Sequence, residues 1–136
     1  MTSLEEITSA DGRIIAIVIK NAFKKDGMNF VSKPHFPLQL GFNSYRKGEK
    51  VKAHVHVERE IVIKEIQEIL YIKTGEVQVD LYDGDKTPFR SFRLFPGDWV
   101  FFVTGGHGIK MIKDTTIIEV KQGPYNGKGQ DKVVIE

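Results

Sequence analysis

The chain contains no cysteine among its 136 residues. This absence excludes disulfide bonds, thiolate zinc sites and cysteine nucleophiles. It also fits a reducing compartment, and we therefore expect a cytoplasmic protein. A chain of this length is expected to form one domain, and it can bury a hydrophobic core without cross-links.

An excess of charge of one sign is lacking as well, and so are long apolar runs. Lys and Arg number 20 against 18 Asp and Glu, which gives a net charge of +2, and the basic residues are scattered along the chain. Such a distribution does not predict a nucleic-acid partner. No apolar run approaches the length that spans a bilayer, and residues 1–6 are acidic where a secretory signal is basic, so no membrane partner is expected.

Helical periodicity hardly occurs, whereas apolar and polar residues alternate with a period of two in many short segments. Turn sequences such as Thr74-Gly75 and Pro96-Gly97-Asp98 separate these segments. Many short strands at close spacing predict a closed all-β barrel or sandwich. The expected strands cover residues 13–23, 38–45, 50–57, 66–73, 76–82, 89–95, 99–103, 108–113 and 115–121.

The predicted organisation is a single domain over residues 1–136, with a barrel at about 38–121. Residues 1–37 form an N-terminal strand region, in which residues 4–7 are either a helical turn or a first strand. Residues 122–136 form a C-terminal tail, and its Gly- and Lys-rich part, 126–132, is expected to be mobile.

Two histidines, His54 and His56, lie one residue apart on the expected strand 50–57. Side chains alternate between the faces of a strand, so both imidazoles share a face, about 6.6 Å apart. Lys52 shares that face. Two further polar residues, Glu68 and His107, alternate with apolar neighbours on their own strands. A carboxylate in such surroundings needs a cation or a metal ion as a partner.

These residues resemble the first conserved motif of the cupin superfamily. Five residues separate Gly48 from His54-Val55-His56, and six residues separate Glu68 from Gly75, as in the cupin motif. The gap of eleven residues between His56 and Glu68 is longer than the three or four of the cupin pattern. The second cupin motif is matched more loosely by Gly97, Gly105 and His107, because Val103 replaces a proline, His107 arrives one residue early and the final asparagine is missing.

The resemblance implies a double-stranded β-helix, or jelly-roll barrel, that commonly forms a homodimer. It also implies one divalent metal ion per chain, such as Mn, Fe, Zn or Ni. Carried over onto this sequence, its ligands would be His54, His56, Glu68 and His107. A His-x-His pair alone is more often structural than metal-binding. The spacing of Glu68 to Gly75, and the Pro96-Gly97-Asp98 turn ahead of His107, favour the metal site.

Other charged residues near these histidines have alternative roles. Glu60 is the rival carboxylate ligand, four residues after His56, but no glycine follows it at the matching distance. Residues 57–67 are expected to form an ordered flap with an Ile61-Val62-Ile63 core. Arg59 and Lys64 on this flap, together with Lys52, are the expected substrate contacts. Strand phase leaves open whether Glu119 and Lys121 point into the barrel or into solvent.

A shell of three imidazoles and one carboxylate leaves two positions on a six-coordinate ion for water or substrate. We therefore expect a metalloenzyme of isomerase, epimerase or lyase type, acting on a compact oxygen-rich metabolite such as a sugar derivative or keto acid. Two alternatives remain open. One is a non-catalytic ligand-binding or sensory cupin. The other is a metal-free sugar-nucleotide ketoisomerase with the His pair as acid and base.

A homodimer is also expected from the residues themselves. The run from Ile14 to Ile19 is apolar without interruption. Such a strand is too apolar on both faces to form a solvent-facing edge, where it would promote aggregation. A second copy of the chain, paired by twofold symmetry, is the expected cover.

Overall fold

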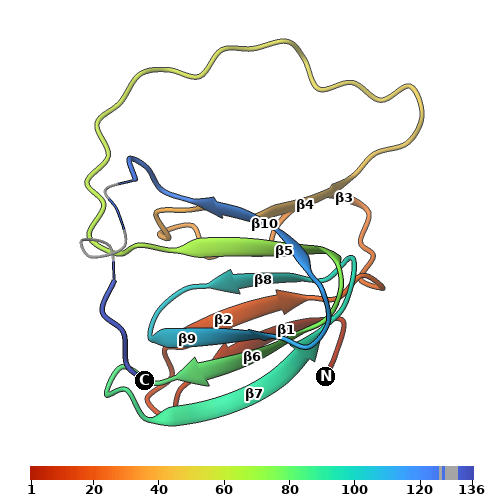
Figure 1. Ribbon diagram of the computed structural model, residues 1–136. Coiled ribbons are helices and arrows are strands. Elements are labelled where there is room, and N and C mark those ends of the chain that lie inside the picture. Colours follow the sequence, from red (N-terminus) through yellow and green to blue (C-terminus); the bar gives the residue numbers. More distant parts are fainter. Residues whose placement is uncertain (126, 128–131) are drawn as a thin grey trace.

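The computed structural model describes residues 1–125, 127 and 132–136, and within them the chain forms ten β-strands (Figure 1). The described part contains no helix long and apolar enough to cross a membrane. The chain is a single all-β domain with antiparallel sheets. Its strands are β1 (Leu4–Thr8), β2 (Ile14–Ile19), β3 (Gly27–Phe30), β4 (Gly41–Ser44), β5 (Glu68–Thr74), β6 (Val77–Tyr82), β7 (Pro88–Leu94), β8 (Trp99–Phe102), β9 (Gly106–Met111) and β10 (Thr116–Lys121).

Strands from β5 onward match the expected segments to within two residues at each end. Residues 4–7, for which the sequence allowed either a helical turn or a strand, lie in strand β1. Of the expected strand 38–45, only Gly41–Ser44 pairs, as β4 with β3. The predicted mobile segment 126–132 falls mostly outside the described residues.

The larger sheet has the strand order β1-β2-β8-β5-β10. β2 lies in its interior, hydrogen-bonded to β1 on one side and to β8 on the other. Residues 15–19 of β2 are buried. The expectation that this strand is an edge strand in need of a second chain was therefore wrong, because β1 and β8 of the same chain flank it. The homodimer itself stays a prediction.

A second sheet, smaller than the first, has the order β7-β6-β9 and packs face to face against the larger one (Figure 1), and β3 and β4 form a separate two-stranded sheet. The two sheets share one apolar core, to which β5 contributes Leu70 and Ile72 and β6 contributes Val77, Val79 and Leu81. A second cluster lies on the opposite face of the larger sheet, where Phe36, Leu38 and Leu40 pack against Ile69 and Phe101. Within the described residues, no hydrogen-bonded ladder joins the two sheets into a closed barrel, and the cupin barrel remains a prediction.

The expected strand at 50–57 is not formed. Residues 45–67 contain no strand, and they project from the sheets as one long segment between β4 and β5 (Figure 1). The expected flap at 57–67 is thus part of a longer excursion, and its Ile61-Val62-Ile63 core is exposed. Alternation gives a segment two distinct faces, but a strand also needs a neighbouring backbone to accept its hydrogen bonds.

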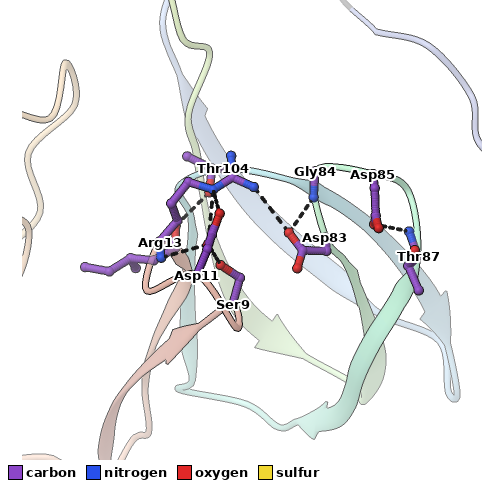
Figure 2. A network of polar contacts seen from close by, with 9 residues as sticks. Ser9, Asp11, Arg13, Asp83, Gly84, Asp85, Thr87 and Thr104 are labelled. Atoms are coloured by element: carbon purple, nitrogen blue, oxygen red, sulfur yellow. Dashed lines mark hydrogen bonds and ion pairs between the residues drawn. The ribbon is translucent and has the colours of Figure 1, made fainter.

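Polar contacts brace one end of the sheets (Figure 2). Arg13, after the β1–β2 turn, contacts Asp83 of the β6–β7 turn at 3.3 Å. Thr104, after β8, donates its hydroxyl hydrogen to the Ile14 carbonyl oxygen at 2.8 Å. The β8–β9 connection is also constrained at Gly105, where φ is +72° and a Cβ would lie 2.5 Å from the Tyr82 carbonyl oxygen. The hydrogen bond of Thr104 and the close packing at Gly105 therefore constrain the connection from β8 to β9.

Candidate functional site

Glu68 lies at the start of β5 on the inner face of the larger sheet. Its register partners are Phe102 on β8 and Lys121 on β10, and directly paired residues of antiparallel strands share a face. Phe102, Glu68 and Lys121 therefore form a row across three strands. The next rows inward are apolar except for Glu119, because Leu70 pairs with Val100 and Glu119, and Ile72 pairs with Ile117.

His107 reaches the same place from the opposite sheet. It lies on β9, paired with Leu81 of β6, so that its ring is directed toward the shared core. The imidazole stacks on the Phe102 ring with centroids 3.7 Å apart and planes at 4°. His107 Nε2 lies 3.7 Å from Glu68 Oε1. The structure thus brings together two residues that sequence analysis selected as ligands, 39 positions apart.

A small cavity of about 210 Å³ adjoins this pair, lined by Glu68, Leu70, Ile109, Ile117 and Glu119. Its walls come from β5 and β10 of the larger sheet and from β9 of the smaller one. β9 and β10 are each the outermost strand of their sheet. The cavity therefore lies where the two sheets are not joined.

The pKa values of the two carboxyl groups in this cavity are shifted in opposite directions. Burial raises the pKa of Glu68, but the neighbouring His107 and Glu119 side chains, together with the charge of Lys121, hold this pKa below its usual value. The neighbouring Glu68 carboxyl group, together with burial, raises the pKa of Glu119. Glu68 is accordingly the residue that favours the ionised form, and Glu119 the residue that holds a proton more readily.

The other two predicted ligands lie elsewhere. His54 and His56 are exposed on the 45–67 segment, with ring centroids 5.3 Å apart. His54 Nδ1 lies 2.7 Å from the Lys52 carbonyl oxygen. Among the described residues, no three His, Asp or Glu side chains gather closely enough to hold one ion. Two of the four predicted ligands are therefore assembled, and two are not.

The predicted substrate contacts Lys52, Arg59 and Lys64 lie on the same exposed segment, as does the rival carboxylate Glu60. Glu68 differs from Glu60 in its partial burial and its contact with His107. The choice of Glu68 over Glu60 as the carboxylate ligand stays a prediction. Gly75 itself occupies the β5–β6 turn with φ of +93°, where a Cβ would collide with Thr115 and with the Asp114 carbonyl oxygen.

Sequence reasoning missed the stacking of Phe102 on His107 and left the direction of Glu119 and Lys121 open. Sequence alternation indicates only that Phe102 belongs to the core. No sequence signal identified its partner ring, because the contact joins different sheets. The direction of Glu119 follows from its register with Leu70, which sequence alternation does not provide.

A second, larger depression of about 380 Å³ lies beside the β6–β7 hairpin. Its carboxylate, Asp80, already accepts a hydrogen bond from the Ser91 hydroxyl at 2.5 Å and another from Gln78 Nε2 at 3.0 Å. These two bonds hold the pKa of Asp80 below its usual value. The smaller cavity is the candidate site, because two carboxyl groups line it and the imidazole of His107 lies beside one of them.

Comparison of the chain with protein-family models, curated proteins and solved structures found no match. The side chains of the site and their surroundings are therefore the basis for assigning a function.

Proposed function

We propose that this chain is a small metal-binding protein of the cupin type, an enzyme of isomerase, epimerase or lyase type for a compact oxygen-rich metabolite such as a sugar derivative or keto acid. The observation that carries the proposal is the contact of Glu68 with His107 at 3.7 Å beside a cavity. A carboxylate and an imidazole are common ligands of Mn, Fe, Zn and Ni.

The four predicted donors are of the chemical kinds that such an ion takes, although the described residues do not gather three of them in one place. Glu68 and His107 supply one oxygen and one nitrogen donor at the cavity. His54 and His56 supply two more nitrogens on the segment that leads directly into β5 and Glu68. A bound divalent ion would polarise an oxygen atom of the substrate. Lys121, in the same inward row as Glu68, is placed to attract the negative charge of an acidic metabolite.

Metal analysis of protein purified without a histidine tag tests the proposal. We expect about one divalent ion per chain in the unaltered protein. The double variant His54→Ala, His56→Ala should lose most of it. His35→Ala serves as the matched control, because this histidine packs against Phe36 in another loop. Stoichiometric metal in the double variant would contradict the proposed site.

The carboxylate ligand has its own test. Glu68→Gln should reduce metal content more than Glu60→Gln, because Glu68 adjoins His107 and Glu60 is exposed on the long segment. Both substitutions remove one negative charge from an isosteric side chain. If Glu60→Gln is the more damaging change, the ligand assignment is wrong.

One observation favours a second candidate, a metal-free ketoisomerase that acts on a sugar nucleotide by acid–base chemistry. Glu68 and Glu119 line the same cavity, and the pKa of Glu68 is lowered by His107 and Glu119 while the pKa of Glu119 is raised by Glu68. One group then serves as acid and the other as base. Isomerisation of a sugar nucleotide that survives dialysis against a chelator, and is lost in Glu119→Gln, would support this candidate over the metalloenzyme.

A further inference from the structure

The two packed sheets are connected along one side and open along the other. On the connected side, Arg90 Nη2 of β7 lies 2.8 Å from Glu5 Oε2 of β1, so that an ion pair joins two outermost strands. On the other side the outermost strands are β9 and β10, and no ladder within the described part of the chain joins them. The candidate cavity lies on this open side. A segment that covers the open side would therefore control entry to the cavity.

The tail residues 132–136 return to this open side. Ile135 packs against Gly106, the first residue of β9 and the neighbour of His107. A Cβ at Gly106 would lie only 3.1 Å from Ile135 Cδ1 and 3.3 Å from Tyr82 Cβ. In Figure 1 the end marked C accordingly lies near the start of β9. The tail thus reaches the smaller sheet directly beside the histidine of the candidate site.

The beginning of the same tail lies near the larger sheet. Lys132 is close enough to Glu119 of β10 for its positive charge to act on that carboxyl group. Charges exposed to solvent act on each other only over short distances, because salt screens them. The step from residue 132 to residue 135 covers about 10 Å in an extended chain, which is also the usual separation of two packed sheets. The tail therefore bridges the two sheets beside the cavity.

A single side chain holds most of this bridge in place. Val133 and Val134 are 80% and 74% exposed, whereas Ile135 is partly buried. Partial burial of an isoleucine favours the docked position by a factor of about three to ten. Segments with few buried apolar contacts open at low cost in free energy. The tail is therefore docked in most molecules and is readily released.

We propose that residues 132–136 are a strap across the open side of the cavity, anchored by Ile135 on Gly106, and that a ligand enters when this strap is released. Release breaks the Ile135 contact and removes the charge of Lys132 from the cavity. The inference rests on the proposed function in one respect, that this cavity is the site. It concerns access and not chemistry, so it applies equally to the metalloenzyme and to the metal-free ketoisomerase.

The rate at which diethylpyrocarbonate modifies His107 measures access to the site. This reagent attacks the unprotonated imidazole, and the His107 side chain, which faces Glu68, is 30% exposed. Mass spectrometry of proteolytic fragments gives the extent of modification at each histidine. His54 and His56 provide an internal reference, because both are exposed on the 45–67 segment.

Two variants that add the same charge separate release of the strap from a change in electrostatics. Ile135→Asp places a carboxylate where the isoleucine packs on Gly106, and Val134→Asp places it one residue earlier, at an exposed position. We expect His107 to react about threefold faster or more in Ile135→Asp than in Val134→Asp, since the apolar contact is lost only in the first. Ile135→Leu keeps an apolar side chain and should react like the unaltered protein.

Equal rates at His107 in the two aspartate variants would overturn the proposal. A parallel rise at His54 and His56 would overturn it as well, because it would indicate loosening of the whole domain. The labelling is done on the protein as purified and again after dialysis against a chelator, since an ion bound to His107 would itself block the reagent. The difference between the variants is expected in the dialysed protein whether or not metal was bound, so failure of the metal site and failure of the strap are distinguishable.

Discussion

Asp98 offers the sharpest test of how the strands that carry the site are held. This residue ends the Pro96-Gly97-Asp98 turn before β8, and it is 2% exposed. Its carboxylate accepts hydrogen bonds from Lys20 Nζ at 2.5 Å, from the Asn21 amide at 2.8 Å and from the Phe95 amide at 2.7 Å. It thus joins the end of β2 to the start of β8.

The cost of Asp98→Ala follows from these contacts. Hydrogen bonds to a charged group contribute about 1.5–3 kcal/mol each, but they do not simply add when one group makes all three. Lys20 retains some access to water, because its side chain is 22% exposed. Removal of one partner from a buried ion pair typically costs about 3–5 kcal/mol. We expect a loss in this range, which is a large part of the total stability of about 5–15 kcal/mol of most domains.

Urea unfolding followed by circular dichroism measures the effect. Asp98→Asn should cost less, about 1–3 kcal/mol, because the amide keeps one acceptor oxygen for a backbone N–H. Asp85→Ala is the matched control, since Asp85 lies in an exposed turn and its side chain bonds only to Thr87. Its unfolding midpoint should be unchanged within error. A loss below about 1 kcal/mol for Asp98→Ala, with an unchanged urea slope, would refute the reasoning.

Three further predictions concern the site, its support and the assembly. Because the folded-state pKa of Glu119 is raised, the stability it contributes is present at acidic pH and is lost as the pH rises through that pKa. Glu119→Gln should therefore stabilise the fold at pH 7, by less than about 1 kcal/mol for such an exposed group, and the gain in thermal denaturation should vanish near pH 4. Gly105→Ala should lower the free energy of unfolding by about 1–3 kcal/mol, because Gly105 has a positive φ and a Cβ there would meet the Tyr82 carbonyl oxygen. Gly108→Ala is the control, since open space surrounds Gly108, and equal melting temperatures of the two variants would contradict the prediction. Light scattering should give a dimer mass at micromolar concentration, and a monomer mass would reject the homodimer.

The strands from β5 to β10 were predictable because two independent signals agree there. Apolar alternation gives the faces, and glycine-containing turns such as Thr74-Gly75 mark the ends. The same spacing selected Glu68 over Glu60, and the structure places Glu68 beside His107. Local sequence was sufficient for these positions because strand phase and turn geometry are both local properties.

Two features were not predictable from local sequence. The uniform apolar run Ile14–Ile19 is compatible with a covered edge strand or with a strand inside a sheet, and only the pairing of β2 with β1 and β8 decides between them. The segment 50–57 alternates as regularly as any strand, yet the described structure gives it no neighbour. In both cases the missing information is the identity of the adjacent strand, which depends on residues far away in the sequence.

Polar side chains, among them Glu68, occupy the end row on the inner face of the larger sheet. Glu68 lies one row from Leu70 and two rows from Ile72, in a position where an apolar side chain would pack against Phe102 without desolvating a charge. Buried ionic groups often stabilise a fold less than apolar residues of similar volume. A carboxylate retained there, with an imidazole opposite it and a second carboxyl beside it, is therefore better explained by ligand binding or catalysis than by folding. The adjoining cavity lies between β9 and β10, two outermost strands that have no further neighbour in the described part of the chain.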